Sequence, residues 1–151
     1  MEATYVKCYT KQFMKIILLV LLSSPILSQN FNSHDIVGTW LPEDKSVHIH
    51  IYETNNVYYA TATNNVGEPI RIKDIHNPDP NLRNRYISNI LIIKDLVYNN
   101  DGEWQDGEIY DPSKGEIYSC EIKMVDLNTI RVTGYKILSM FWKYEVWRRI
   151  K

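Results

Sequence analysis

Two aspartates and two arginines lie close together in the middle of the chain, with Asp74 and Asp79 followed by Arg83 and Arg85. A guanidinium can bind a carboxylate or another planar anion through two parallel hydrogen bonds. The four residues therefore support two interpretations. In the favoured one, they bind one another and pin their segment to the rest of the fold. In the other, they line a site for an anion or a carboxylate ligand at the mouth of a barrel.

Asn77 in the same segment, together with Tyr110 and Tyr118 further along the chain, completes the candidate ligand-binding set. Aromatic side chains usually fill the core of a small domain. Around an interior that is not filled, the same rings would line a pocket for an amphipathic ligand. The sequence leaves both roles open for the two tyrosines.

Metal and thiol chemistry have little support. His48 and His50 are two residues apart on one face of an expected strand, as two metal ligands could be, but the sequence assigns no third ligand. An outward polar face is the favoured interpretation. Cys120 alternates with Ile122 and Met124 and is predicted to be a small core residue. We expect no metal and no cofactor.

Acid–base catalysis is a weaker hypothesis than binding. Five carboxylates fall in one expected hairpin, where stabilised turns and an exposed polar face explain them: Asp101, Glu103, Asp106, Glu108 and Asp111. No motif joins a nucleophile to a base, and no glycine-rich phosphate loop occurs. A hydrolase that uses the 74–85 segment is the least favoured of the functions considered.

The elements that must position these residues are strands. From Asp35 onward the chain has the period-two alternation of β-structure, and no segment has the pattern of a long helix. Eight strands are expected in sequential order, at 36–41, 47–52, 57–63, 89–98, 103–110, 115–124, 128–135 and 143–150. We predict an all-β fold, an eight-stranded antiparallel up-and-down barrel with one long ordered loop at about 65–88.

Four residues near the two ends of this domain are predicted to form a structural clasp. Gly38 would let the ring of Trp40 tuck under the barrel floor, and an arginine of the last strand would cover that ring. Alternation places Arg149 on the same face as Trp147. Arg148 would point the other way, so Arg149 is expected to cover Trp40.

The first 28 residues are predicted to be a signal peptide, of which residues 1–13 look like an extension from an early start codon. Met14 and Lys15 precede a short apolar run at 16–22, and cleavage is expected after Ser28, with Ser24 as the alternative. Residues 29–151 then form one β-barrel domain with net charge −3, because the leader removes three basic residues and one acidic residue. This charge argues against a nucleic acid partner.

The order of several short motifs resembles the bacterial domain-of-unknown-function 2147 family over about residues 31–150. The motifs are Gly38-Thr39-Trp40, Asn77-Pro78-Asp79-Pro80 with Leu82, Arg83 and Arg85, Gly107-Glu108-Ile109-Tyr110-Asp111-Pro112, Gly115 with Tyr118-Ser119-Cys120, Gly134-Tyr135, and Trp147 with Arg149. The resemblance implies a small exported bacterial protein with a lipocalin-like (calycin) barrel. It implies no established activity and no catalytic residues.

Two positions depart from that family pattern, and one of them creates an unusual surface. Glu116 replaces an expected lysine, and Trp142 replaces an expected small residue at the last hairpin. The apolar segment Ile137–Trp142 is therefore expected to cover one barrel end, to dock on a protein partner or to touch a membrane surface.

Three functions follow, in order of preference. The first is non-catalytic binding of a small, partly apolar ligand inside the barrel. The second is an envelope or secreted interaction module with a filled barrel, and the third is the hydrolase. An interior space of roughly 300 Å³ or more favours the first over the second. The sequence does not determine the oligomeric state.

Overall fold

A computed structural model of the chain describes residues 30–136, 138 and 141–150. The predicted signal peptide lies outside this range, and its cleavage stays a prediction. Among the described residues, no helix has the length and hydrophobicity needed to cross a bilayer.

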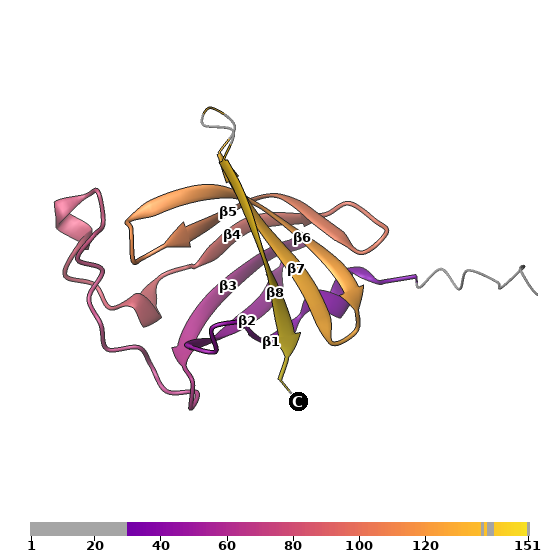
Figure 1. The fold of residues 1–151 in the computed structure, drawn as a ribbon, viewed down its shortest axis with the longest axis horizontal. Coiled ribbons are helices and arrows are strands. Elements are labelled where there is room, and N and C mark those ends of the chain that lie inside the picture. Colours follow the sequence, from indigo (N-terminus) through magenta and orange to yellow (C-terminus); the bar gives the residue numbers. More distant parts are fainter. Residues whose placement is uncertain (1–29, 137, 139–140, 151) are drawn as a thin grey trace, which may run out of the picture.

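The eight strands form one closed antiparallel barrel in sequential order, with β8 returning to β1 (Figure 1). The predicted fold class is confirmed. The strands are β1 (Gly38–Leu41), β2 (Val47–Thr54), β3 (Val57–Asn64), β4 (Ile93–Tyr98), β5 (Glu103–Asp111), β6 (Glu116–Asp126), β7 (Thr129–Lys136) and β8 (Phe141–Arg149).

Two of the expected strands begin later than predicted, because short 3₁₀ helices precede them. Ile36 ends the helix η1 (Ser33–Ile36) and is buried under the barrel, so β1 starts only at Gly38. The segment before β4 contains η3 (Ile87–Asn89), and β4 starts at Ile93 instead of residue 89. Apolar residues with no clear alternation suit a buried turn as well as a strand, which explains both differences.

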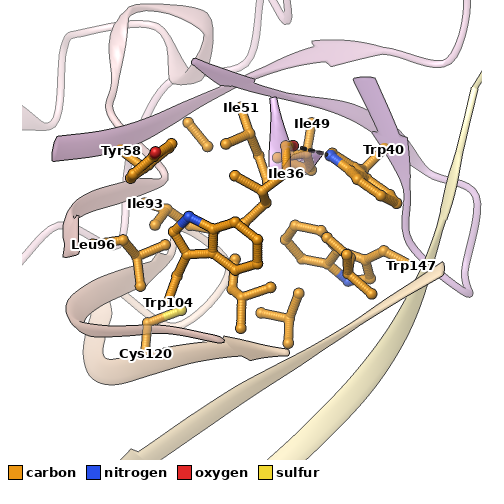
Figure 2. Packing of buried hydrophobic residues seen from close by; sticks show 14 of the residues in the cluster. Ile36, Trp40, Ile49, Ile51, Tyr58, Ile93, Leu96, Trp104, Cys120 and Trp147 are labelled. Carbon is orange, nitrogen blue, oxygen red and sulfur yellow. Dashed lines mark hydrogen bonds between the residues drawn. The ribbon is translucent and has the colours of Figure 1, made fainter. Parts of the chain in front are cut away.

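The barrel is filled at the end where β1 begins. Trp40 and Trp104 are completely buried there, and Ile36, Tyr58 and Leu96 pack in the same cluster (Figure 2). Tyr58 and Trp104 meet edge to face, with their ring centroids 6.1 Å apart. Large rings that interdigitate in this way exclude water and leave little free volume. We call this half of the barrel the closed half.

The clasp residues meet at the floor of the closed half. The indole Nε1 of Trp40 donates to the carbonyl of Ile36 at 2.8 Å, and the Arg149 guanidinium lies 4.1 Å from the centroid of the Trp40 ring. Arg149 also donates to the carbonyls of Val37 and Leu127, at 2.9 and 2.7 Å. Arg149 therefore joins β1, β8 and the β6–β7 turn.

Gly38 is required at this clasp for two reasons. Its φ of +142° is rarely adopted by residues with a side chain, and a Cβ atom would lie 2.5 Å from Nη1 of Arg149. The glycine thus gives the guanidinium the space to reach the carbonyl of Val37.

The long connection from Asn64 to Ile93 leaves the opposite end of the barrel, at the left of Figure 1, and carries η2 (Pro80–Leu82) and η3. Asp79, which directly precedes Pro80, caps η2 by accepting a hydrogen bond from the amide of Asn81 at 2.9 Å. The connection meets the β5–β6 turn at Gly115, whose φ is +70°. A Cβ atom on Gly115 would overlap the carbonyl oxygen of His76.

We expect Gly115→Ala to lower the free energy of unfolding by about 1–3 kcal/mol, because it adds both backbone strain and a clash with His76. Gly67→Ala is a matched control: Gly67 has a φ of +84°, but nothing lies within 4 Å of the added Cβ. It reports the cost of strain alone, about 1 kcal/mol. Urea unfolding measures both variants, and equal losses would contradict a close approach of the connection at Gly115.

Candidate ligand site at the barrel mouth

The open half of the barrel contains a cavity of about 460 Å³, which we call the mouth cavity. Its apolar wall comes from the inner faces of the strands and from the segment before β4: Ile49, Ile92, Ile109, Val132 and Trp147. Gly134 also borders the space, and a Cβ atom there would make only ordinary contacts of 3.6 Å with Ile109 and Tyr118. A small residue at this point therefore widens the cavity.

Polar and charged side chains surround the opening of the mouth cavity. They come from the β1–β2 turn, the β5–β6 turn and β8: Asp44, Ser46, Asp111, Ser113, Lys114, Lys143 and Glu145. The cavity therefore combines an apolar interior with a hydrogen-bonding rim, which is the usual construction of a small-molecule site.

Most rim charges are paired within the chain. Lys143 Nζ donates to Glu145 Oε1 at 2.8 Å, and this hydrogen bond to the carboxylate raises the pKa of Lys143. Lys114 and Asp111 form a second pair at 3.3 Å. The two lysine side chains are more than half exposed and the two carboxylates are partly exposed, so a ligand could replace either partner at small cost.

Tyr118 lies at the same end of the barrel, next to one carboxylate and two ammonium groups. Its hydroxyl donates to Glu116, a bond that raises the pKa of Tyr118 and lowers that of Glu116. The ammonium groups of Lys136 and Lys114 lie 4.7 and 5.9 Å from the Tyr118 ring centroid. The ring of Tyr118 thus makes cation–π contacts with two lysines of the same chain.

The sequence interpretation missed Ser46, Lys143 and Glu145 as rim residues. A signal for two of them was present: Lys143, Glu145 and Trp147 alternate in β8, so any arrangement that buries Trp147 also turns the two charged side chains inward. Charged residues on the inner face of a strand indicate that the interior is open to water at that level.

Asp74 is completely buried beneath the long connection and is fully engaged in hydrogen bonds. Tyr110 Oη donates to Oδ1 at 2.6 Å, and Asn77 Nδ2 donates to Oδ2 at 2.8 Å. Arg85 donates to Oδ2 from Nε at 3.3 Å and from Nη2 at 3.2 Å. Because Tyr110 belongs to β5, this network pins the connection to the barrel.

The network shifts the titration of both of its acidic groups. Burial alone would raise the pKa of Asp74, but the donors Tyr110, Asn77 and Arg85 together outweigh it and lower the pKa. Burial and the bond to Asp74 raise the pKa of Tyr110 to about 12. Asp74 is therefore a charged acceptor and Tyr110 a neutral donor across the physiological pH range.

Among the described residues, Asp79 and Arg83 form no ion pair with each other, and each has a different partner. Asp79 caps η2, and Arg83 Nε donates to the backbone carbonyl of Asn77 at 2.7 Å. The aspartate side chain is short, and an aspartate that precedes a helical turn commonly accepts a hydrogen bond from a backbone amide of that turn. Asp79 does so here and is therefore not paired with a side chain several residues away. Only half of the expected arginine–aspartate pairing is present.

The less favoured interpretation, a ligand site at the barrel mouth lined by the two arginines, has none of its aspartate, asparagine or arginine residues at the mouth cavity. Asp74, Asn77, Asp79, Arg83 and Arg85 do not border the mouth cavity. Three of them, Asn77, Asp79 and Arg85, border a neighbouring groove of about 520 Å³, which shares Ile92 and Tyr110 with the mouth cavity. Its other wall is the outer surface of the barrel at Lys94, Glu108 and Ile117. Of the candidate set, only Tyr110 and Tyr118 border the mouth cavity.

His50 and Cys120 occupy structural positions in the barrel. His50 contacts Thr39 and Thr63 through its two ring nitrogens, each at 2.9 Å, and so bridges β1, β2 and β3 on the outside of the barrel. Cys120 is completely buried, and burial raises the pKa of its thiol to about 12. In the described part of the chain, no three side chains of His, Cys, Asp or Glu converge as metal ligands would.

The apolar segment Ile137–Trp142 lies partly outside the described residues, which exclude Ile137, Ser139 and Met140. Leu138 and Trp142 are described, and both are strongly exposed. A contact of this segment with a protein or a membrane stays a prediction.

Comparison with known proteins agrees with this architecture. A search of curated proteins gives no match. A solved structure of similar fold is that of protein HP1028 from the human pathogen Helicobacter pylori, described as belonging to the lipocalin family. It is 23% identical, with a TM-score of 0.69 over 77% of this chain and 83% of that chain. The model of a family described as uncharacterised proteins conserved in bacteria, DUF2147, matches residues 38–149. The chain belongs to this family.

Proposed function

We propose that this protein is exported and binds a small amphipathic ligand in the mouth cavity without catalysing a reaction. The observation that carries the proposal is the contrast between the two halves of the barrel. The closed half is filled by Trp40 and Trp104, whereas the open half retains about 460 Å³. That volume lies within the range of sites for small molecules, roughly 300–1,000 Å³.

The walls of the cavity define the ligand class. Ile49, Val132 and Trp147 would contact an apolar body, and the hydroxyls and charges of the rim would bind a polar head. The fold of the Helicobacter pylori lipocalin supports the same use of the interior, since closed eight-stranded barrels can hold one small ligand. Export rests on the apolar run that follows Lys15.

Native mass spectrometry of the full chain, expressed in a bacterium and recovered from its periplasm or medium, tests the proposal. We expect the mass of a chain that starts after Ser28 or Ser24, plus a bound species of a few hundred daltons that is released on collisional activation. Gly134→Leu, which places a side chain in the cavity, should remove the added mass. It should also reduce binding of an added long-chain amphiphile at least about tenfold.

Thr133→Leu is the matched control, because its side chain lies on the opposite face of β7 and does not border the mouth cavity. It should retain the ligand. Equal binding by both variants would place the ligand elsewhere, and a chain that carries no added mass and binds no amphiphile would refute the proposed function. An uncleaved chain found only in the cytoplasm would refute export.

A further inference from the structure

One edge of β8 is unpaired along its first half. β1 has four residues and pairs with β8 at two positions, Trp40 with Arg149 and Leu41 with Arg148. The ladder ends at Pro42, which has no amide hydrogen and whose carbonyl accepts from Lys45. Within the described residues, no strand pairs with β8 beside residues 142–146 on this side.

The direction of the backbone groups in β8 is fixed by two hydrogen bonds. The amide of Arg149 donates to Asn128, towards β7, and the amide of Ile150 donates to Thr39, towards β1. Because these directions alternate along an antiparallel strand, Trp142, Tyr144 and Val146 present their amides and carbonyls at the open edge. Such an edge is a template for pairing with another strand.

This edge is complementary to itself in one register only. Two copies that pair antiparallel about a two-fold axis must place residues 142, 144 and 146 opposite residues of the same set, so the axis passes through residue 143, 144 or 145. An axis at Lys143 opposes two lysines, and one at Glu145 opposes two glutamates. An axis at Tyr144 places each Lys143 opposite the partner's Glu145.

The outer face of β8 fits the same register. Trp142 is 72% exposed and Tyr144 is 57% exposed, an unusual amount of aromatic surface for one short strand. With the axis at Tyr144, the two tyrosines lie side by side and each Trp142 lies beside the partner's Val146. Cross-strand pairs of aromatic and β-branched residues stabilise antiparallel sheets.

We propose that two copies of this chain associate through antiparallel pairing of β8, with the two-fold axis at Tyr144. The ladder adds hydrogen bonds from Trp142, Tyr144 and Val146 of each copy. Since Lys143 and Glu145 border the mouth cavity, the partner's Lys143 lies at the wall of this cavity. Each copy thereby adds a strand to the wall of the other copy's mouth cavity, beside the part of β8 that β1 does not reach.

Sedimentation equilibrium of the purified wild-type chain and of two charge variants tests the register. The interface is small, so we expect wild-type dimers with a dissociation constant of about 10–500 µM. With the axis at Tyr144, position 143 of each copy lies opposite position 145 of the other. In a dimer of K143E both of these cross-strand pairs join two glutamates, and in a dimer of E145K both join two lysines. Each variant alone should dimerise at least about tenfold more weakly than wild type.

An equimolar mixture of K143E and E145K restores opposite charges at both positions across the axis. The mixture should form dimers about as strongly as wild type, although each chain still carries like charges at 143 and 145. This outcome separates pairing between chains from the ion pair within one chain. A mixture no stronger than either variant alone would overturn the proposal, as would a wild-type chain that stays monomeric up to about 1 mM.

Tyr144→Pro provides a second test that does not depend on charge. The amide of Tyr144 points to the open edge, where proline is tolerated because no ladder bond within the barrel is lost. The variant should retain its circular dichroism spectrum and lose the dimer. A folded Tyr144→Pro variant that dimerises like wild type would contradict strand pairing at this edge.

Discussion

Replacing Trp40 by alanine is expected to lower the free energy of unfolding by about 3–5 kcal/mol, the usual cost of truncating a buried tryptophan. Trp40 has no exposed surface, its indole donates to Ile36, and its ring supports the Arg149 guanidinium at 4.1 Å. The substitution therefore opens a void and leaves the carbonyl of Ile36 without this donor. A domain of this size has a total stability of about 5–15 kcal/mol, so much of it would be lost.

Urea unfolding followed by circular dichroism measures this effect without relying on tryptophan fluorescence. Trp142→Ala is the matched control, because it removes the same side chain from a position that is 72% exposed. In dilute protein it should change stability by no more than about 0.5 kcal/mol. Similar losses for both variants would show that Trp40 is not a buried anchor of the barrel.

Asp74→Ala is expected to cost about 2–4 kcal/mol and to release the long connection from the barrel. The substitution removes the acceptor for Tyr110 and Asn77, which are both buried, and for Arg85, which is one-third exposed. Buried donors without an acceptor are costly, whereas Arg85 can regain water. Limited proteolysis with trypsin should cut the variant faster than the wild type within the connection, at residues 65–92.

The contribution of Asp74 should also depend on pH. Its pKa in the folded protein is below the ordinary value of 3.8, so the unfolded chain binds a proton first as the pH falls. The stabilisation is therefore complete well above pH 3.8 and is lost as the pH falls through the lower pKa of the folded state. Asp74→Asn should lack this dependence, and the stability gap between it and wild type should narrow below about pH 4.

Asp79→Asn is the control for both measurements, because Asp79 is the other aspartate of the segment and is exposed. Asparagine is also a good helix cap, so the change should cost less than about 1 kcal/mol. If Asp79→Asn released the connection as strongly as Asp74→Ala, the buried network would not be its main anchor.

The strand order was predictable because each strand carries its own alternation and its own turn residues. The same local rule selected Arg149 over Arg148 as the partner of Trp40, since only one of them shares the face of Trp147. It failed at Ile36, which ends the 3₁₀ helix η1, and at residues 89–92, where η3 ends and only Ile90 and Ile92 are buried before β4 begins. There the burial depends on contacts from distant strands, which a local pattern does not contain.

The arrangement of the candidate site was much less predictable. The sequence grouped Asp74, Asp79, Arg83 and Arg85 by proximity, yet only Asp74 and Arg85 bind each other. The remaining partners of Asp74 include Tyr110, which is 36 residues away. Hydrogen-bond partners at this separation are chosen by the packing of the connection on the barrel, not by spacing along the chain.

By itself, the sequence determined that this chain forms a barrel and which residues of a strand share one face, because period-two alternation is a property of each strand alone. The tertiary structure decided where the barrel stays open. Filling the closed half with tryptophans, ending β1 at Pro42 and docking the connection on Gly115 all depend on the distances between elements. These distances keep Asp74 and Arg85 away from the mouth cavity, which only Tyr110 of their network borders, and leave the edge of β8 free.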